Sequence, residues 1–348
     1  MKRIVTLGEP MTMFVADDVG PLDEINHYTR FVAGAELNVA IGLARLGNFV
    51  TYVTRLGDDP FGKYIHRLLR DTGLDDAGVT IDDTYPTGFQ LKSKVTTGDP
   101  EVVYFRKNSA ASHLSRADIE HIDLTNVHHV HVTGIPLALS TDAREAEFAL
   151  IKKAKERGIR VSFDPNLRPS LWPDTETMVE TVNRAAALCD IILPGIGEGA
   201  ILTGSSDERE IAAFYRQLGV KGTIVKLGPR GAYVDVDSDL ELGISLDTDV
   251  HLDVDLDVDL NVDLDVDVDL GGKPYVVPSF SVDHVVDTVG AGDGFAVGVI
   301  SGLLDGLSLR DAVMRGNAIG AMQVMVPGDN EGLPSQAQLA AFLAKHRV

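Results

Sequence analysis

The chain has little of what secreted, membrane-spanning or nucleic-acid-binding proteins need. It has one cysteine, Cys189, so no internal disulfide can form and a reducing cytoplasm is the expected compartment. It holds no run of about 18 apolar residues, so we expect no membrane span, and its N-terminal apolar stretch is too short for a signal peptide. Lysine and arginine number 31 against 52 aspartates and glutamates, a net charge of −21, which argues against nucleic acid as a partner.

Most of the negative charge lies in one segment. Residues 235–270 hold thirteen Asp, one Glu and no Lys or Arg, and so account for −14 of the −21. Every even position from 250 to 270 is Val or Leu, and nearly every odd one is Asp. Strict alternation favours a β-strand, although neighbouring aspartates on one face repel one another. Three interpretations of this insert, at 236–272, stay open: an extended β-arm, a disordered acidic loop, and a Ca²⁺-binding or acidic interaction module.

The rest of the chain alternates short apolar runs with amphipathic stretches. We expect strands at 3–7, 50–56, 127–133, 160–163, 191–193 and 223–227, and helices at 37–46, 61–71, 141–157, 175–188, 207–218, 293–304, 308–325 and 335–345. This alternation predicts one α/β domain over 1–348, with a mostly parallel sheet and helices on both faces. Ligands of such sheets bind beyond the carboxyl ends of the strands. The stretches 11–33 and 86–106 are instead typical of extended hairpins, whose placement the residues alone leave open.

The most informative stretch is Asp-Thr-Val-Gly-Ala-Gly-Asp-Gly at 287–294. It follows a strand-like apolar pair, Val285 and Val286, and precedes a segment typical of a buried helix. A glycine-rich turn at a helix start directs unpaired backbone N–H groups toward one point, where the helix dipole adds positive potential. The turn therefore suits a phosphate. Asp293 within it either caps the helix or accepts a proton from an attacking hydroxyl.

This string resembles the C-terminal signature of the ribokinase-like (PfkB) carbohydrate kinases. The resemblance implies a ribokinase-like fold in which 11–33 and 86–106 form a small β-sheet lid over the sugar, with ATP and Mg²⁺ as cofactors. It also implies that Asp293 is the catalytic base and that Gly290, Ala291 and Gly292 form an anion hole.

Other motifs match the same family pattern. Gly34 stands before an expected helix and Asn38 one turn into it, and the matching residues of the family hold the sugar. Glu198 matches a glutamate that organises Mg²⁺ through water, although Gly195 replaces the usual asparagine. The resemblance places the following residues on the nucleotide side: Asn166, Glu198, Lys226, Gly228, Gly231, Gly290, Gly292 and, near the adenine, Asn317.

Three strings are similar to those of sugar-acid kinases, in particular 2-keto-3-deoxygluconate kinases. Tyr104 and Arg106, in Tyr-Phe-Arg-Lys, stand where those enzymes contact the acid, and an arginine fork matches a carboxylate, although a solvated basic edge is the alternative. Arg168, in Asp-Pro-Asn-Leu-Arg, is assigned to the substrate and to the charge of the transferring phosphoryl group. Asp329, in Gly-Asp-Asn-Glu-Gly, is placed near the substrate, and Gln90 stands where those enzymes can carry a tyrosine.

The sequence thus predicts an ATP-dependent kinase that phosphorylates the terminal hydroxyl of a sugar acid. The first candidate is 2-keto-3-deoxygluconate, with 2-keto-3-deoxy-6-phosphogluconate as product. A kinase of fructose, tagatose or 5-keto-2-deoxygluconate stays open, as does a non-catalytic sugar-binding regulator. We expect a cytoplasmic homo-oligomer, a dimer or larger, without nucleic-acid or membrane partners.

Overall fold

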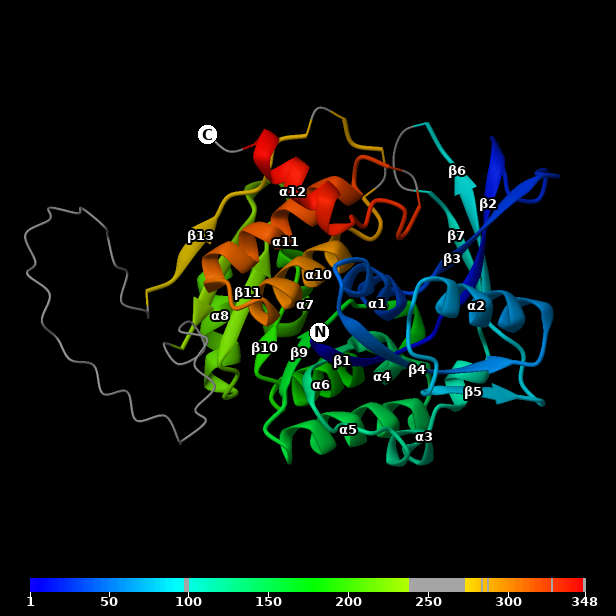
Figure 1. Cartoon of the computed structure of the whole chain (residues 1–348), viewed down its shortest axis with the longest axis horizontal. Helices are drawn as coiled ribbons and strands as arrows, with labels where there is room; N and C mark the ends of the chain where they lie inside the picture. The colour runs from blue at the N-terminus through cyan, green and yellow to red at the C-terminus, as the bar shows by residue number, and fades with distance from the viewer. Residues whose placement is uncertain (97–99, 238–272, 283, 287, 327, 347–348) are drawn as a thin grey trace, which may run out of the picture.

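The computed structural model describes residues 1–96, 100–237, 273–282, 284–286, 288–326 and 328–346 (Figure 1). The acidic repeat at 238–272 lies outside the described residues, so its three interpretations stay predictions.

In the described part of the chain, nine strands form one sheet in the order β13-β12-β11-β10-β9-β8-β1-β4-β5. The strands from β5 to β11 in that order pair in parallel, and β12 and β13 are antiparallel additions at one edge. The strands are β1 (Arg3–Leu7), β4 (Phe49–Gly57), β5 (Val79–Asp82), β8 (Val127–Thr133), β9 (Arg160–Asp164), β10 (Ile191–Ile192), β11 (Gly222–Lys226), β12 (Ala232–Val236) and β13 (Tyr275–Val277).

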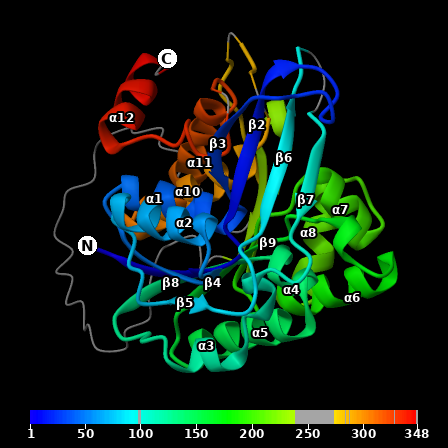
Figure 2. The same ribbon diagram turned by 90° about the vertical axis from the view of Figure 1, so that its right-hand side faces the viewer.

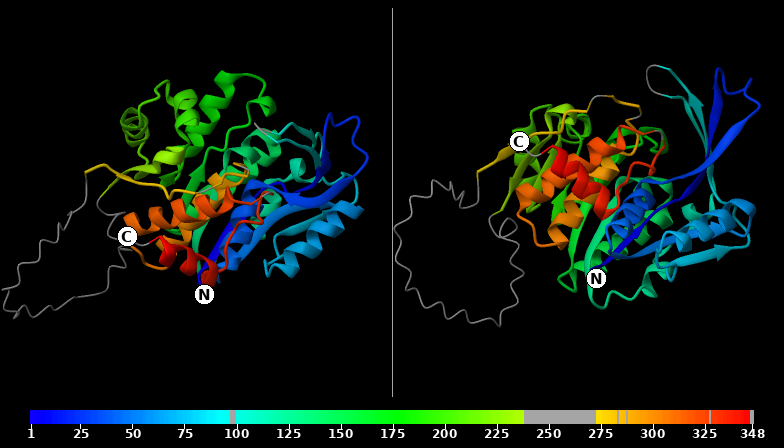
Figure 3. Two further views of the ribbon diagram at one scale, coloured as in Figure 1. Left: turned by 90° about the horizontal axis from the view of Figure 1, so that it is seen from above. Right: turned by 45° about the horizontal axis from the view of Figure 1, so that its top comes forward.

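Helices cover both faces of this sheet, as Figure 3 shows with green helices along one side and orange to red helices along the other. One face carries α1 (Ala35–Arg45), α2 (Pro60–Asp71), α10 (Ala291–Leu304), α11 (Leu309–Gln323) and α12 (Gln336–Lys345). The other carries α3 (Arg116–Glu120), α4 (Gly134–Leu139), α5 (Thr141–Lys155), α6 (Thr175–Ala186), α7 (Ile196–Thr203) and α8 (Glu208–Gln217).

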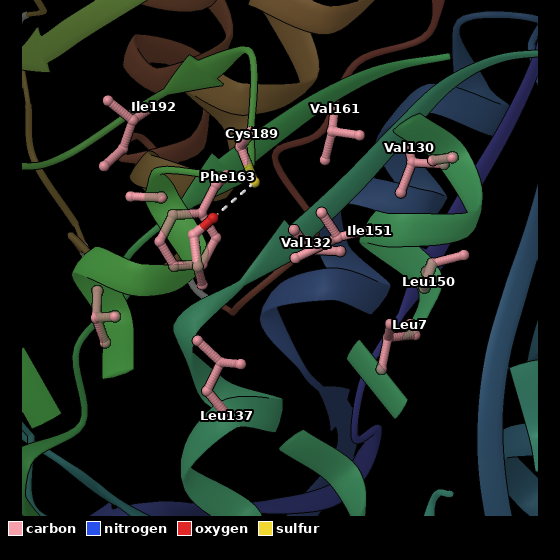
Figure 4. Packing of buried hydrophobic residues seen from close by; sticks show 14 of the residues in the cluster. Leu7, Val130, Val132, Leu137, Leu150, Ile151, Val161, Phe163, Cys189 and Ile192 are labelled. Carbon is pink, nitrogen blue, oxygen red and sulfur yellow. Dashed lines mark hydrogen bonds between the residues drawn. The ribbon is translucent and has the colours of Figure 1, made fainter. Parts of the chain in front are cut away.

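Two apolar cores form because successive strand residues point to opposite faces. In β1, Ile4 packs under α1 and α10, whereas Val5 and Leu7 pack under α5. Strands that are buried on both faces are therefore continuous apolar runs in the sequence, and this pattern is the one that predicted them. Figure 4 shows the α5-side core, where Cys189 is buried and its Sγ donates a hydrogen bond of 3.3 Å to the Ala185 carbonyl.

A smaller sheet of four described strands projects to one side of the main sheet (Figures 1 and 2). Its order is β3-β2-β6-β7, built from β2 (Met11–Val19), β3 (Tyr28–Ala33), β6 (Phe89–Lys94) and β7 (Val102–Phe105). The β2–β6 pair is parallel and the others are antiparallel. Phe14 and Phe89 pack against Phe61 of α2, with ring centroids 5.6 and 5.5 Å away, so one face of this sheet is anchored to the main body. The predicted fold class is confirmed.

Helices α10 and α11 touch through their backbones. A Cβ added to Gly298 would lie 2.4 Å from the Gly316 Cα, and one added to Gly302 would lie 2.7 Å from the Ala312 Cα. No side chain would fit at Gly298 or Gly302, so α10 is held close against α11.

The prediction that a strand at Val285 and Val286 precedes α10 is wrong. Val285 and Val286 lie outside any described strand and are 54% and 45% exposed. The Val286 amide donates to the Val324 carbonyl, 2.7 Å away just beyond α11, instead of pairing with the sheet. Among the described helices, none is long and apolar enough to cross a membrane.

Candidate active site

A cavity of about 370 Å³ lies at the carboxyl ends of the parallel strands, between the small sheet and the N-termini of α1 and α10. It brings together most of the site residues predicted from the sequence. Those that line it are Gly34, Asn38, Gln90, Tyr104, Arg106, Asn166, Arg168, Glu198, Lys226, Gly290, Gly292, Asp293 and Asp329.

Asp293 lies in the first turn of α10 and is 9% exposed. The N-cap of this helix is Gly290, so the alternative that Asp293 caps the helix is wrong. Gly290 has φ of 78°, and a Cβ there would lie 2.5 Å from the Asp329 carbonyl oxygen, so this position requires glycine. The backbone therefore bends sharply at Gly290 into α10, and Asp293 faces the cavity.

Burial raises the pKa of Asp293 to about 7. The hydrogen bond from Asn38 lowers this pKa, the charge of Asp164 raises it, and the nearby Arg168 and Lys226 lower it. The Asp293 Oδ2 accepts from the Asn38 Nδ2 at 2.8 Å, and its Oδ1 accepts from the Asn166 Nδ2 at 3.4 Å. This carboxylate can therefore gain or lose a proton near neutral pH.

Asn38 has only one orientation that satisfies its neighbours. Its Oδ1 accepts from the Nδ2 of Asn330 at 3.3 Å, and the same Nδ2 lies 3.1 Å from the Val32 carbonyl oxygen. The Nδ2 of Asn38 is thereby directed at Asp293.

Lys226, at the end of β11, forms a 2.6 Å ion pair with Asp164, at the end of β9. Burial alone would lower the pKa of Lys226, but Asp164 and Glu198 outweigh it, and the pKa is raised above its ordinary value. A Cβ added to Gly292 would lie 3.3 Å from the Lys226 Nζ. A charged ammonium group thus stands beside the glycine turn of α10.

Glu198 holds the loop that carries Asn166 and Arg168. Its Oε1 accepts from the Leu167 amide at 2.8 Å and its Oε2 from the Gly195 amide at 2.7 Å. Arg168 donates to the carbonyls of Asn166 and Leu167 at 3.3 and 3.0 Å, and it forms no ion pair within the described ranges. Its positive charge is therefore available to an anion that enters the cavity.

The small sheet supplies the opposite wall. Gln90 and Tyr104 are register partners on β6 and β7, and so lie on the same face of the sheet. Lys92, two residues after Gln90, is 5% exposed and lies 3.6 Å from Asp329. Arg106, which was expected to bind a substrate carboxylate, lines the cavity but is already paired with Glu9.

Three charged residues of the cavity wall were not assigned a role from the sequence: Glu9, Lys92 and Asp164. Asp164 begins the Asp-Pro-Asn-Leu-Arg string, and its position at a strand end was an available signal. Glu9 and Lys92 carry no local signal, because their partners lie 97 and 237 positions away in the chain.

Four predicted residues do not line the cavity. The Ala291 amide donates to the Thr288 carbonyl at 3.4 Å, inside the turn. Gly231, with φ of 93°, turns the chain into β12, where a Cβ would lie 2.0 Å from the Val277 carbonyl oxygen. The Asn317 Nδ2 donates to the carbonyls of Val277 and Pro278, both at 3.0 Å. Gly228 begins a 3₁₀ turn shortly after Lys226. Contact with a nucleotide stays a prediction for these residues.

A base that titrates near neutrality, beside two cations and an anion-attracting helix start, suits phosphoryl transfer to an alcohol. With this fold around it, the cavity defines a ribokinase-like sugar kinase. Comparison with known sequences places the chain more narrowly: it belongs to the pfkB family of carbohydrate kinases, whose family model matches residues 1–241 and 266–336. The chain is therefore an enzyme that phosphorylates a sugar hydroxyl.

Known relatives and solved structures are similar to this chain over nearly its full length. The chain is 44% identical to a 2-dehydro-3-deoxygluconokinase of Bacillus subtilis (strain 168), over 99% of this chain and 96% of that one. It is 32% identical to a 2-dehydro-3-deoxygluconokinase of Thermoproteus tenax, over 99% and 94%. A PfkB protein from Polaromonas sp. JS666 superposes with a TM-score of 0.81 at 41% identity, covering 98% and 100%. An E. coli protein assigned as a ribokinase II, in complex with ATP and Mg²⁺, superposes with a TM-score of 0.82 at 25% identity, covering 99% and 100%.

Proposed function

We propose that this enzyme transfers the γ-phosphoryl group of ATP to the terminal hydroxyl of 2-keto-3-deoxygluconate, giving 2-keto-3-deoxy-6-phosphogluconate and ADP. The observation that carries the proposal is the Asp293 carboxylate, which faces the cavity with a pKa of about 7 between Asn38 and the Lys226–Asp164 pair. Two relatives named 2-dehydro-3-deoxygluconokinase, matched over nearly the whole chain, support this substrate.

Asp293 acts as the general base. Its carboxylate takes the proton of the sugar's terminal hydroxyl, and the hydroxyl oxygen forms a bond to the γ-phosphorus while the bond to the ADP oxygen breaks. Arg168, Lys226 and the amides of the turn at Gly290–Gly292 stabilise the negative charge on the transferring group. Gly292 stands next to the Lys226 Nζ, which supports a shared role for the turn and the lysine.

The donor groups of the cavity fit Mg²⁺ that arrives with the nucleotide. Among the described residues, no cluster of three or more His, Cys, Asp or Glu could hold a metal ion by itself. Mg²⁺ usually keeps several waters and is bound through one or two carboxylates together with substrate phosphates. Glu198, whose two oxygens already accept backbone amides, would contact it through water, and Asp164 is a further carboxylate of the cavity wall. When bound, Mg²⁺ neutralises charge on the phosphates.

Preference for an acid is supported by the cations around the cavity. Arg106 and Lys92 come from the small sheet and Arg168 from the loop after β9. The planar fork of Arg106 matches a carboxylate bidentately, with Tyr104 stacked near it, 5.6 Å from the guanidinium carbon to the ring centre. We place the substrate between this wall and Asp293, held by Gly34, Asn38, Gln90 and Asp329.

A panel of sugars tests the assignment. ATP consumption is measured with 2-keto-3-deoxygluconate, 5-keto-2-deoxygluconate, fructose and tagatose at equal concentrations. We expect kcat/KM for 2-keto-3-deoxygluconate to exceed that for the neutral sugars by at least about a hundredfold, because a neutral sugar offers no carboxylate to the guanidinium groups of Arg106 and Arg168. A neutral sugar as the best substrate would overturn the proposed substrate and leave the kinase assignment intact.

We further propose a cytoplasmic homo-oligomer that associates through β7, the edge strand of the small sheet. Phe105 on its edge strand is 47% exposed and stacks on Phe89 with centroids 4.5 Å apart. Exposed aromatic groups on an edge strand favour pairing with a second copy. Size-exclusion chromatography with light scattering would measure the oligomer, and a Phe105→Glu variant should shift it toward the monomer.

A further inference from the structure

Glu9 is a buried carboxylate in the cavity wall to which the mechanism above gives no role. It lies between the end of β1 and the start of β2, where the chain passes from the main sheet to the small sheet. Its side chain is 0% exposed. A carboxylate is rarely buried to this extent unless its charge is compensated and its oxygens are hydrogen-bonded.

Both oxygens of Glu9 are used by residues that follow β7. The Oε2 accepts from the Arg106 Nε at 2.7 Å and is also paired with the Arg106 Nη2. The Oε1 accepts from the Ser109 hydroxyl. Glu9 thus binds one edge of the Arg106 guanidinium and is itself held in place by Ser109.

The ends of all four strands of the small sheet meet around Glu9. Glycines make the room: a Cβ added to Gly88, just before β6, would lie 2.8 Å from the Glu9 Oε1. A Cβ added to Gly34, just after β3, would lie 2.8 Å from the Glu9 carbonyl oxygen. The Glu9 side chain therefore occupies a close-fitting space and has little freedom to turn away from Arg106.

A guanidinium has two edges that can each form paired hydrogen bonds, one through Nε and one Nη, the other through both Nη atoms. Glu9 occupies the first edge of Arg106. Arg106 lines the cavity, and its Nη1 contacts no acceptor within the described ranges, so the second edge is the one left to a ligand.

We propose that Glu9 is a positioning residue, which locks the plane of Arg106 so that its Nη1–Nη2 edge receives the substrate carboxylate. The position of that edge then decides how far the sugar chain reaches, and so whether its terminal hydroxyl arrives at Asp293. This inference rests on the proposed sugar-acid substrate. Stability alone does not account for the pair, since buried ion pairs add little net stability compared with apolar groups.

The test is a double-variant cycle with Glu9→Gln, Arg106→Ala and the combination of both. Glu9→Gln should raise KM for 2-keto-3-deoxygluconate about tenfold and leave KM for ATP within about twofold, because only the acid contacts Arg106. Arg106→Ala should raise the sugar-acid KM about a hundredfold, and the combined variant should match Arg106→Ala within about twofold, since Glu9 acts through that residue. Glu147→Gln, a buried carboxylate of α5 outside the cavity, is the matched control and should leave both constants unchanged.

Full additivity of Glu9→Gln and Arg106→Ala, or an unchanged sugar-acid KM in Glu9→Gln, would overturn the inference. If Glu9→Gln does not fold, Ser109→Ala removes the other support of the carboxylate and should raise the sugar-acid KM severalfold, again without effect on ATP. An unchanged KM in Ser109→Ala would then count against it. Failure of the proposed substrate is recognised separately, because the unmodified enzyme would not phosphorylate the acid in the sugar panel.

Discussion

The Nδ2 of Asn38 lies 2.8 Å from the Oδ2 of Asp293, and this hydrogen bond joins α1 to α10 across 255 positions of the chain. Burial raises the pKa of Asp293, and the Asn38 hydrogen bond lowers it, so the two effects together place it at about 7. A base with this pKa is unprotonated in a large fraction of molecules at neutral pH and can still accept a proton. The pair therefore sets both where the base points and when it is active.

Replacing Asp293 by Asn should abolish most of the turnover. The amide keeps the size of the side chain but cannot accept the hydroxyl proton, so we expect kcat to fall by about 10²–10⁴-fold. Binding of ATP, measured by calorimetry, should be retained. Asp305→Asn at the other end of α10, where the carboxylate is 54% exposed, is the control and should keep full activity. A kcat near that of the unmodified enzyme would remove Asp293 from the mechanism.

The pH dependence should show one acid limb near pH 7. Since the pKa of Asp293 is raised to about 7, kcat/KM should rise tenfold per pH unit below that value and level off above it. Asn38→Ala removes a hydrogen bond that lowers this pKa, so its acid limb should move to higher pH. Initial rates measured from pH 5 to 9 would show both effects. An unshifted limb in Asn38→Ala would mean that another group limits the rate.

The Lys226–Asp164 pair should matter for stability as well as for activity. Lys226→Ala leaves the buried Asp164 without its partner, and breaking such a pair costs about 3–5 kcal/mol of the free energy of unfolding. The double variant Lys226→Met with Asp164→Asn removes both charges and should recover most of that loss, while activity stays low. Urea denaturation compares the two. Equal stability of the single and double variants would show that the pair is not coupled in this way.

Glu36 should make the protein less stable as pH rises. It is 0% exposed, its Oε1 accepts from Thr133, and its Oε2 has no partner in the part of the chain that the structure describes. Burial raises its pKa from 4.5 to about 7. The unfolded chain therefore releases this proton at lower pH than the folded one, and the stability contributed by protonated Glu36 is lost between pH 4.5 and about 7.

Glu36→Gln tests this dependence. The variant should be more stable than the unmodified protein at pH 8 by about 3 kcal/mol, from the size of the pKa shift, and similar to it at pH 4.5. Urea denaturation at both pH values measures the difference. A variant whose stability follows that of the unmodified protein at both would show that Glu36 does not cause the dependence.

Removal of residues 238–272 should leave the kinase intact. The strands on either side, β12 and β13, are antiparallel neighbours, with Val234 opposite Tyr275, so a short glycine-containing turn from Asp237 to Lys273 can join them. We expect kcat and both KM values to stay within about twofold, because loop length has a small thermodynamic effect. A large loss of activity in a folded deletion variant would assign the acidic repeat a part in the site.

Local patterns predicted the framework well. The central strands are apolar runs that end in Gly, Asp or Pro, and the turn at 287–294 carries its chemistry in adjacent residues. The pairing of charges in the cavity wall was not predictable in this way, since the partner of Arg106 is Glu9, 97 positions earlier in the chain, in the connection between β1 and β2. The same holds for the strand expected at Val285 and Val286, where a backbone bond to Val324 overrides a local apolar preference.

The glycine contact between α10 and α11 has a consequence for the reaction. Gly298 stands five positions after Asp293 on the same helix, with the backbone of Gly316 directly against it. A single methyl group at this contact would push the two helices apart and move the Asp293 carboxylate out of line with the hydroxyl hydrogen that it accepts. The glycines at this contact thus fix the position of α10 relative to α11. The accuracy of the chemistry therefore depends on packing in the protein interior, away from any substrate.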